Sequence, residues 1–505
     1  MKSILLPVAS PRPCSFDRAR VWLRAGLVCA ALVAAAGNAG AAQPDEGECP
    51  SVVGAPLIEE GKGLVDAPPV LLKEGMRIEA DGLLALRRLL PAVIWQHRDV
   101  FFHEGMRMEI GSCHARYPVF GPYRAATERF RGEPRVDKKN NLEDYTAGLP
   151  FPPEDIDPQQ EQAAIKWAWN LERRFRGAGF RGSFRLTEIP ARIGGILTYE
   201  GDLFYLQTSH RPDLAEQGYV LEDQEPWAFA AGGVFHRPFD ARHLAWRQFR
   251  SLKTFEDYEA ADSTFVYVPS MRKQRRGATN WVDGLYVPTY TAGGEMAGGS
   301  MLYGDGSSTG TSGTISPNAG VSIAASQDKG HGLTGISLRP NAYVWRYLGE
   351  QTVLAPVNVA RNGYPQDPDR HYGVSGLSLA SDRWDVRWAV IIEGAFRIQG
   401  SDLKTMEIWI DYQTQMPLYW ITRTSKRRLL DVGILAHRFS GDIAGYPEWP
   451  GGFPANVFEP VAAVFYNAAG GGGGWRRETY DVRSTPFDEA ERRAMTSSDN
   501  LGKGR

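Results

Sequence analysis

The sequence predicts an α+β protein built on a large antiparallel β-sheet. Several runs of residues alternate apolar and polar side chains with the period of two that is typical of strands. These runs follow one another through turns rather than helices. One segment, residues 157–177, instead repeats its apolar residues at helical spacing. Strands joined by turns pair as antiparallel neighbours, and the alternation gives their sheet one buried face.

The clearest strand pattern covers residues 383–398. Its period of two places an apolar set of side chains on one face, namely Trp384, Val386, Trp388, Val390 and Ile392. The opposite face carries Arg383, Asp385, Arg387 and Glu393. Similar alternation predicts further strands at residues 98–110, 194–206, 262–268 and 343–353.

A hairpin is predicted after this strand. Residues 404–412 alternate, with one face made of Met406, Ile408, Ile410 and Tyr412. The next strand begins at Leu418, after a turn that contains Pro417. Asp411 and Thr414 carry side-chain oxygens that can hydrogen-bond the backbone of this turn.

Residues 157–177, DPQQEQAAIKWAWNLERRFRG, predict an amphipathic helix. Asp157 is suited to cap the first turn, Pro158 to occupy the first helical position and Gly177 to end the helix. The apolar residues at helical spacing are Ala164, Trp167, Ala168, Leu171 and Phe175. A charged side is expected from Glu172, Arg173, Arg174 and Arg176.

The N-terminus predicts export. Arg18, Arg20 and Arg24 precede an apolar run at residues 25–36, and small residues at 37–42 follow it. This order is typical of a cleavable signal peptide, here residues 1–41, and the apolar run is too short for a permanent membrane span. We therefore expect a periplasmic protein that is soluble or loosely membrane-associated.

The predicted organisation beyond the leader has three parts. Residues 42–74 form an N-terminal extension, residues 75–442 form the main body, and residues 443–505 form a C-terminal extension with a flexible tail. Within the body, residues 293–320 are rich in Gly, Ser and Thr, which predicts a flexible insertion. One sheet-based body is preferred, with two closely packed subdomains as the alternative.

Two cysteines remain after the leader, Cys49 and Cys113. In an oxidising compartment they can pair and attach the N-terminal segment to the body. Two unrelated thiols are the alternative, because spacing alone does not decide between these states.

Residues with catalytic or metal-binding potential give weak patterns. The formal net charge of −2 provides no basic excess for nucleic acid. Residues 306–310 match G-x-S-x-G by letters only, because no strand and helix flank them. Zinc sites typically take their ligands in pairs at short spacing, and this pattern is missing from His97, His103 and His114. Glu407 and Asp411 share a strand face, but their backbones would lie about 13 Å apart. The sequence therefore predicts no catalytic residue, no metal, no cofactor and no enzyme.

Several segments together resemble a known family. They are YTAGLPFPPEDID at residues 145–157, the helix that follows it, IWIDYQTQMPLYWI at 408–421, LLPAVIWQHRDVFFHEGMRMEIG at 89–111, HRPFDARHLAWRQFR at 236–250 and NAYVWRYLGEQTVLAP at 341–356. In this order they resemble the bacterial envelope family "domain of unknown function 1329", which is grouped with LolA-like, outer-membrane lipoprotein-sorting proteins.

This resemblance implies a curved sheet in the form of an incomplete barrel, with helices packed over its concave face and an apolar cavity between them. It also implies a carrier whose partners are a lipid or other apolar small molecule, an inner-membrane exporter of the resistance-nodulation-division type and an outer-membrane protein.

Aromatic side chains on the predicted strands are the candidates for lining such a cavity. They are Trp384, Trp388, Trp409, Trp420, Tyr199, Tyr205 and Tyr267. The alternative is ordinary core packing. The preferred function is a non-catalytic periplasmic carrier or chaperone for an apolar molecule. The alternatives are a secreted hydrolase of envelope lipid or polysaccharide with a carboxylate or histidine site, and an adaptor that binds protein through a sheet edge.

Overall fold

The computed structural model describes residues 43–53, 57–59, 63–65, 69–189, 196–221, 227–269, 272–279, 283–285, 287, 313–314, 322–323, 333–360, 372–397, 403–468 and 473–502. The predicted leader, residues 1–41, and the G-x-S-x-G match at 306–310 lie outside the described residues, as does all but 313–314 of the predicted insertion at 293–320.

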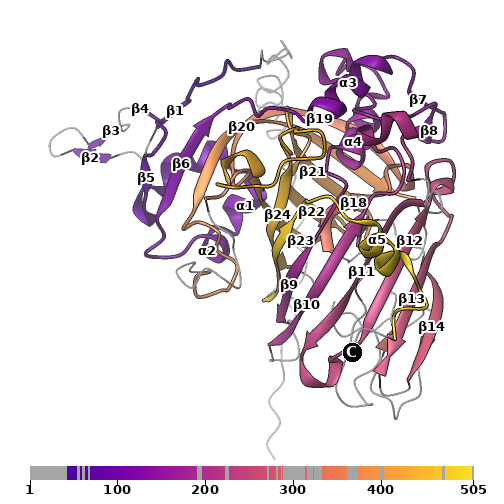
Figure 1. Cartoon of the computed structure of the whole chain (residues 1–505). Coiled ribbons are helices and arrows are strands. Elements are labelled where there is room, and N and C mark those ends of the chain that lie inside the picture. Colours follow the sequence, from indigo (N-terminus) through magenta and orange to yellow (C-terminus); the bar gives the residue numbers. More distant parts are fainter. Residues whose placement is uncertain are drawn as a thin grey trace, which may run out of the picture. The chain divides into compact units, whose positions relative to one another are not determined.

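One sheet of fifteen described strands dominates the structure (Figure 1). Its order is β14-β13-β12-β11-β10-β9-β25-β24-β23-β22-β21-β20-β6-β5, and β19 also pairs with β20. Every pairing is antiparallel except that of β20 with β6. The path has two ends that do not pair with each other, so the sheet is open. The prediction of a large antiparallel sheet is confirmed.

The strands of this sheet are β5 (Arg77–Ile78), β6 (Met108–Cys113), β9 (Gly179–Ile189), β10 (Leu197–Leu206), β11 (Trp227–Arg237), β12 (Ala245–Ser251), β13 (Asp262–Val268), β14 (Lys273–Thr279), β19 (Tyr343–Ala355), β20 (Arg383–Phe396), β21 (Thr405–Asp411), β22 (Pro417–Arg423), β23 (Leu429–Phe439), β24 (Phe458–Asn467) and β25 (Gly474–Arg483). The strand predicted at residues 98–110 is wrong in its first part. Residues Arg98–Phe101 form a helical turn that buries Phe101, and β6 begins only at Met108.

Smaller pairs of strands lie outside this sheet. They are β1 (Ser51–Val53) with β4 (Pro69–Leu71), β2 (Leu57–Glu59) with β3 (Gly63–Val65), β7 (Arg135–Val136) with β8 (Leu142–Glu143), β15 (Asp283–Leu285) with β18 (Leu333–Leu338), and β16 (Gly313–Thr314) with β17 (Ser322–Ile323).

The described α-helices are α1 (Ala92–Gln96), α2 (Arg98–Phe101), α3 (Gly121–Arg129), α4 (Ala163–Arg173) and α5 (Glu489–Thr496). The described 3-10 helices are η1 (Ala80–Leu89), η2 (Pro153–Asp155), η3 (Pro212–Gln217), η4 (Phe239–Ala241), η5 (Leu252–Phe255), η7 (Pro340–Ala342) and η8 (Ser440–Asp442).

Helix α4 is the helix that the sequence predicts at residues 157–177, but it is shorter. It begins after Gln162, so Asp157 and Pro158 precede it, and the Asp157 side chain instead accepts a hydrogen bond from the Gln159 N–H at 2.9 Å. Trp167 and Leu171 are buried as expected. The four residues of the charged side are buried as well, namely Glu172, Arg173, Arg174 and Arg176.

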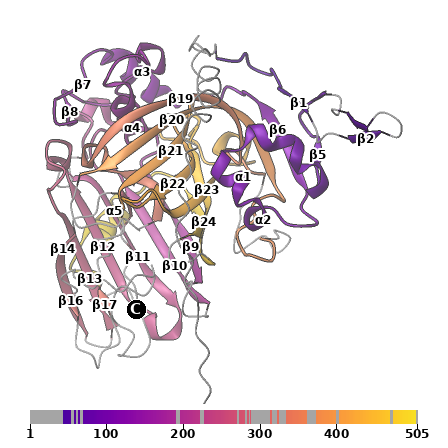
Figure 2. The same ribbon diagram turned by 180° about the vertical axis from the view of Figure 1, so that it is seen from behind.

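The sheet curves around α4. Helix α4 packs against β18, β19 and β20 (Figure 2). One hydrophobic cluster, here called the inner core, unites Trp167 of α4 with Trp246 of β12 and Ile408 of β21. These strands lie at distant places in the sheet order. Side chains from both regions of the sheet therefore meet around α4 on the concave face.

A second cluster, here called the N-terminal core, covers the other face of β20–β24. It contains Leu86 of η1, Ile94 of α1 and Phe101 of α2 together with Trp409 and Tyr419 of the sheet. The strands β21–β24 are consequently apolar on both faces, which explains why most of their residues are buried and none is fully exposed.

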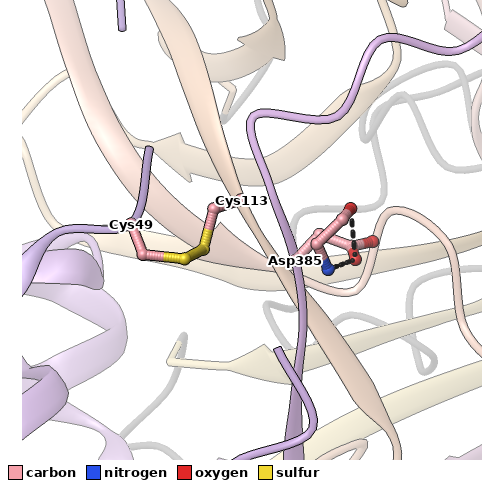
Figure 3. The surroundings of a disulfide bond; sticks show 4 residues. Cys49, Cys113 and Asp385 are labelled. Carbon is pink, nitrogen blue, oxygen red and sulfur yellow. Dashed lines mark hydrogen bonds between the residues drawn. A yellow bond between two sulfur atoms is a disulfide. The ribbon is translucent and has the colours of Figure 1, made fainter. Parts of the chain in front are cut away.

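A disulfide joins Cys49 to Cys113, the last residue of β6, with a Cα–Cα distance of 5.2 Å (Figure 3). Asp385 lies beside it in β20. The Asp385 carboxylate accepts hydrogen bonds from the Ser112 N–H at 2.9 Å and from the Asn358 N–H at 3.1 Å. The disulfide attaches the N-terminal segment to β6, and the two hydrogen bonds join β6 and the segment after β19 to β20.

We expect Asp385 to make the protein more stable at mildly acidic pH. Burial raises the pKa of this carboxyl to about 6, whereas an unfolded chain has an Asp pKa of about 3.9. Because the folded pKa is the higher one, the folded state takes up the proton first, and stability rises as pH falls from 7 to 5 by about 1 kcal/mol. Asp385→Asn should abolish this rise. Urea denaturation of both proteins at the two pH values measures it, and an equal rise in the variant would refute the assignment.

Candidate functional site

The concave side of the sheet is occupied by the protein's own strand β18, whose six residues are all buried. Charged side chains bind its backbone. Glu172 accepts from the Leu338 N–H at 2.6 Å and Glu478 accepts from the Thr334 N–H at 3.1 Å. Arg176 donates to the Ile336 carbonyl. Charged residues of α4, of the segment after it and of β25 thus hold an interior strand in place.

Asp262 is the centre of a second buried set of charges. It accepts hydrogen bonds from Arg250 at 3.0 Å, from Arg339 at 2.9 Å and from the side-chain amide of Gln248 at 2.8 Å. Arg250 also donates to Ser337 of β18 at 2.7 Å. Burying charges is unfavourable unless they are paired and hydrogen-bonded, and these groups meet that condition.

A cavity bordered by described residues on this side of the sheet is small. A cavity of about 20 Å³ lies between β18, β23 and β24, bordered by Arg174, Ile336, Leu435 and His437 among others. That volume suits one water molecule and excludes an acyl chain. Burial lowers the pKa of His437 to about 3. His437 is therefore a neutral imidazole, and the cavity beside it is too small to admit a substrate.

The seven aromatic residues suggested as cavity lining are divided among several surroundings. Trp420, Tyr199 and Tyr205 belong to the inner core. Trp384 and Trp409 belong to the N-terminal core. Trp388 donates its ring N–H to Glu350 at 2.9 Å, and Tyr267 packs with Ala245 and Leu501 on the outer face. None of the seven lines the cavity above or the groove that follows.

A much larger space lies on the outer face of β9–β12 and β25, beneath the C-terminal segment. This C-terminal groove has a volume of about 770 Å³ and is lined by Arg181, Gly182, Asp202, Leu203, Phe204, Gly233, Val234, Ala245, Arg247, Asp481, Arg483, Thr485, Met495, Asn500 and Leu501. Helix α5 packs over β11 and contributes Met495 (Figure 1). The volume falls in the range of about 300–1,000 Å³ that is typical of small-molecule sites.

The floor of the groove follows from strand register. Ala245 of β12 faces Val234 of β11, which faces Asp202 of β10. Because alternate residues of a strand share a face, Phe204 of β10 lies on the same side as Asp202. Apolar contact surface is therefore continuous across three strands, and Leu501 of the C-terminal segment packs against Ala245 from above.

Helix α5 is positioned by its own N-terminus and by an ion pair. Asp488 and Glu491 form a reciprocal capping box, in which each side chain accepts from the other's backbone N–H. The same Glu491 carboxylate contacts Arg181 on the groove floor. The helix that covers the groove is thus fastened to its floor.

The carboxylates that the sequence placed on one strand face are each paired with an arginine. Asp411 binds Arg387 at 2.6 Å and Glu407 binds Arg423 at 3.0 Å. Within the described ranges, no group of three or more His, Cys, Asp or Glu residues is arranged to hold a metal ion. In the same part of the chain, no helix is long and apolar enough to cross a membrane.

Three solved structures resemble this chain. A putative outer membrane lipoprotein-sorting protein domain from Vibrio parahaemolyticus is 12% identical, with a TM-score of 0.36, covering 68% of this chain and 100% of its own. A DUF1329 family protein from Desulfovibrio piger is 13% identical, with a TM-score of 0.36, covering 68% and 99%. A LolA superfamily protein from Nitrosomonas europaea is 10% identical, with a TM-score of 0.29, covering 65% and 94%.

The names of these structures include those of the families that the sequence resembles. No family model and no curated protein matches the sequence. The C-terminal groove was not predicted, because its floor combines residues from β9, β10, β11, β12 and β25, and only the register of the sheet brings them together. The one local signal is the segment 245–250, where Arg247 interrupts the apolar face of Ala245 and Phe249.

Proposed function

We propose that this protein is a non-catalytic periplasmic carrier, and that the C-terminal groove holds its lipid or other apolar cargo. The observation that carries the proposal is the volume of about 770 Å³ next to the apolar side chains Phe204, Val234, Ala245, Met495 and Leu501. Transfer of apolar surface from water into such a groove is favourable by about 25 cal/mol per Å². The cavity inside the sheet, at about 20 Å³, is too small for the same task.

The surroundings of the carboxylates in the sheet and beside the C-terminal groove support a carrier rather than a hydrolase. A hydrolase needs a titratable group beside a cleft that admits substrate. The buried carboxylates Asp262 and Asp411 are neutralised by arginines. Two carboxylates border the groove, and each has a partner: Asp202 lies 2.8 Å from His236, and Asp481 lies 3.6 Å from Arg483.

Native mass spectrometry of the mature protein from a periplasmic extract, followed by lipid analysis of the released material, tests the proposal. A discrete apolar molecule that remains bound is the expected result. A protein that carries no such molecule and binds no apolar probe in titration would contradict it.

Val234→Trp should reduce bound cargo by at least about tenfold, because an indole at this floor position fills the space of an acyl chain. Val344→Trp is the matched control, since Val344 is 55% exposed on β19 and is not part of the groove. Both proteins are purified in the same way, and the cargo-to-protein ratio is measured by mass spectrometry. Equal ratios in the two variants would exclude the groove as the cargo site.

A further inference from the structure

A row of side chains crosses the floor of the C-terminal groove next to its apolar row. Arg247 of β12 faces Gly232 of β11, which faces Phe204 of β10. Phe204 faces Arg181 of β9, and Arg181 faces Arg483 of β25. Three arginines therefore lie in one line across the sheet, on the face that the groove exposes.

Two of these arginines have acidic partners. Arg181 contacts Glu491 of α5. Arg483 lies 3.4 Å from Glu459 and 3.6 Å from Asp481. Their charges are thus compensated within the protein.

Arg247 differs from the other two. Its Nη1 donates to the Trp246 carbonyl at 2.9 Å, and its guanidinium lies 4.9 Å from the centre of the Phe204 ring. Its Nε is buried and has no hydrogen-bond partner. Among the residues that the structure describes, no carboxylate lies within ion-pair distance of Arg247. Burial lowers the pKa of Arg247 to about 10.

Gly232 allows this placement of Arg247. A Cβ at position 232 would clash with the Trp246 carbonyl oxygen and would lie 3.0 Å from the arginine Cδ and 3.1 Å from its Nη1. Without that atom, the arginine side chain extends past β11 and its guanidinium lies over the ring of Phe204. Because Nε is buried and Nη1 bonds the Trp246 carbonyl, an anionic carboxylate or phosphate would be bound through Nη2.

We propose that the C-terminal groove selects anionic amphiphiles, in which Arg247 binds a carboxylate or phosphate group and the apolar part lies along Phe204, Val234 and Met495. This inference rests on the proposed function, because it assigns a ligand class to the same groove. The anion supplies the charge that Arg247 lacks, and the apolar part displaces water from the floor.

Fluorescence titration of the mature protein with cis-parinaric acid and with its methyl ester tests this inference. The two probes share one chain and differ only in the negative charge. A charge-assisted hydrogen bond favours the acid by about 10- to 100-fold in Kd. Arg247→Gln should remove this preference, so that the acid and the ester bind with similar Kd values, whereas Arg247→Lys should keep part of it. Arg346→Gln, which removes a 68% exposed arginine far from the groove lining, should behave as wild type.

The outcomes separate the two proposals. Equal Kd values for acid and ester in the wild-type protein would overturn the anion preference and leave the carrier function standing. Failure of both probes to bind would overturn the carrier function itself. Displacement of the acid by inorganic phosphate at millimolar concentration would indicate a site for free anions and would overturn the selection of an amphiphile. Melting curves confirm that each variant is folded, and the comparison of the two wild-type titrations needs no variant at all.

Discussion

Asp262→Ala is expected to lower the free energy of unfolding by about 3–5 kcal/mol, because two buried guanidinium groups lose the carboxylate that both of them bond. Arg250 and Arg339 are both 2% exposed, and each bonds this single carboxylate. Burial already lowers the pKa of Arg339 to about 10. The expected loss is a large part of the about 5–15 kcal/mol that stabilises a typical domain.

Urea denaturation followed by tryptophan fluorescence measures this loss. Asp155→Ala is the matched control, since Asp155 makes a two-point contact with Arg131 on the surface. Exposed ion pairs contribute little, so the control should unfold at the wild-type midpoint. If the two variants shifted the midpoint equally, the buried charge cluster would have no special role in stability.

The helix at residues 157–177 shows how far the sequence predicts this fold. The spacing of Trp167 and Leu171 identified the helix and its buried side. The surroundings of Glu172 were not predictable, because its partners Ser337 and Leu338 are far away in the chain. Periodicity reports which residues share a face, but it does not report what covers that face.

The strands, too, were predicted from the sequence only in part. Alternation predicted β13 at residues 262–268 and β20 from residue 383. It did not predict the C-terminal groove, whose floor requires Arg181, Phe204, Gly232 and Arg247 to stand in register. Register depends on the pairing of complete strands, so a single strand pattern contains no information about it.

The hairpin between β21 and β22 combines a predicted part and an unpredicted part. The sequence suggested that Asp411 and Thr414 bond local backbone, and the Asp411 carboxylate does accept from the Thr414 N–H at 2.7 Å and from its hydroxyl at 2.8 Å. The unpredicted part is Arg387 of β20, which donates to the same carboxylate at 2.6 Å and to the Ala115 carbonyl at 2.6 Å. One buried group therefore joins the turn, the neighbouring strand and the segment after β6.

Asp411→Asn should lower the free energy of unfolding at neutral pH by about 3–5 kcal/mol, because Arg387 then stays buried beside a neutral amide. Burial by itself would raise the pKa of Asp411, but Arg387 outweighs it and holds the pKa below the usual value. The stabilisation is consequently complete above the unfolded pKa of about 3.9 and is lost as pH falls towards the lower folded pKa. Urea denaturation at pH 7 and pH 3 should show a smaller difference between wild type and variant at the lower pH.

Glu407→Gln is the matched control on the same strand. The pair that it breaks is more accessible to water, since Glu407 and Arg423 are 15% and 19% exposed. The free energy of unfolding should therefore fall clearly less in Glu407→Gln than in Asp411→Asn. A loss for Asp411→Asn no larger than that of the control would show that the fully buried pair with Arg387 contributes no more than a partly exposed pair.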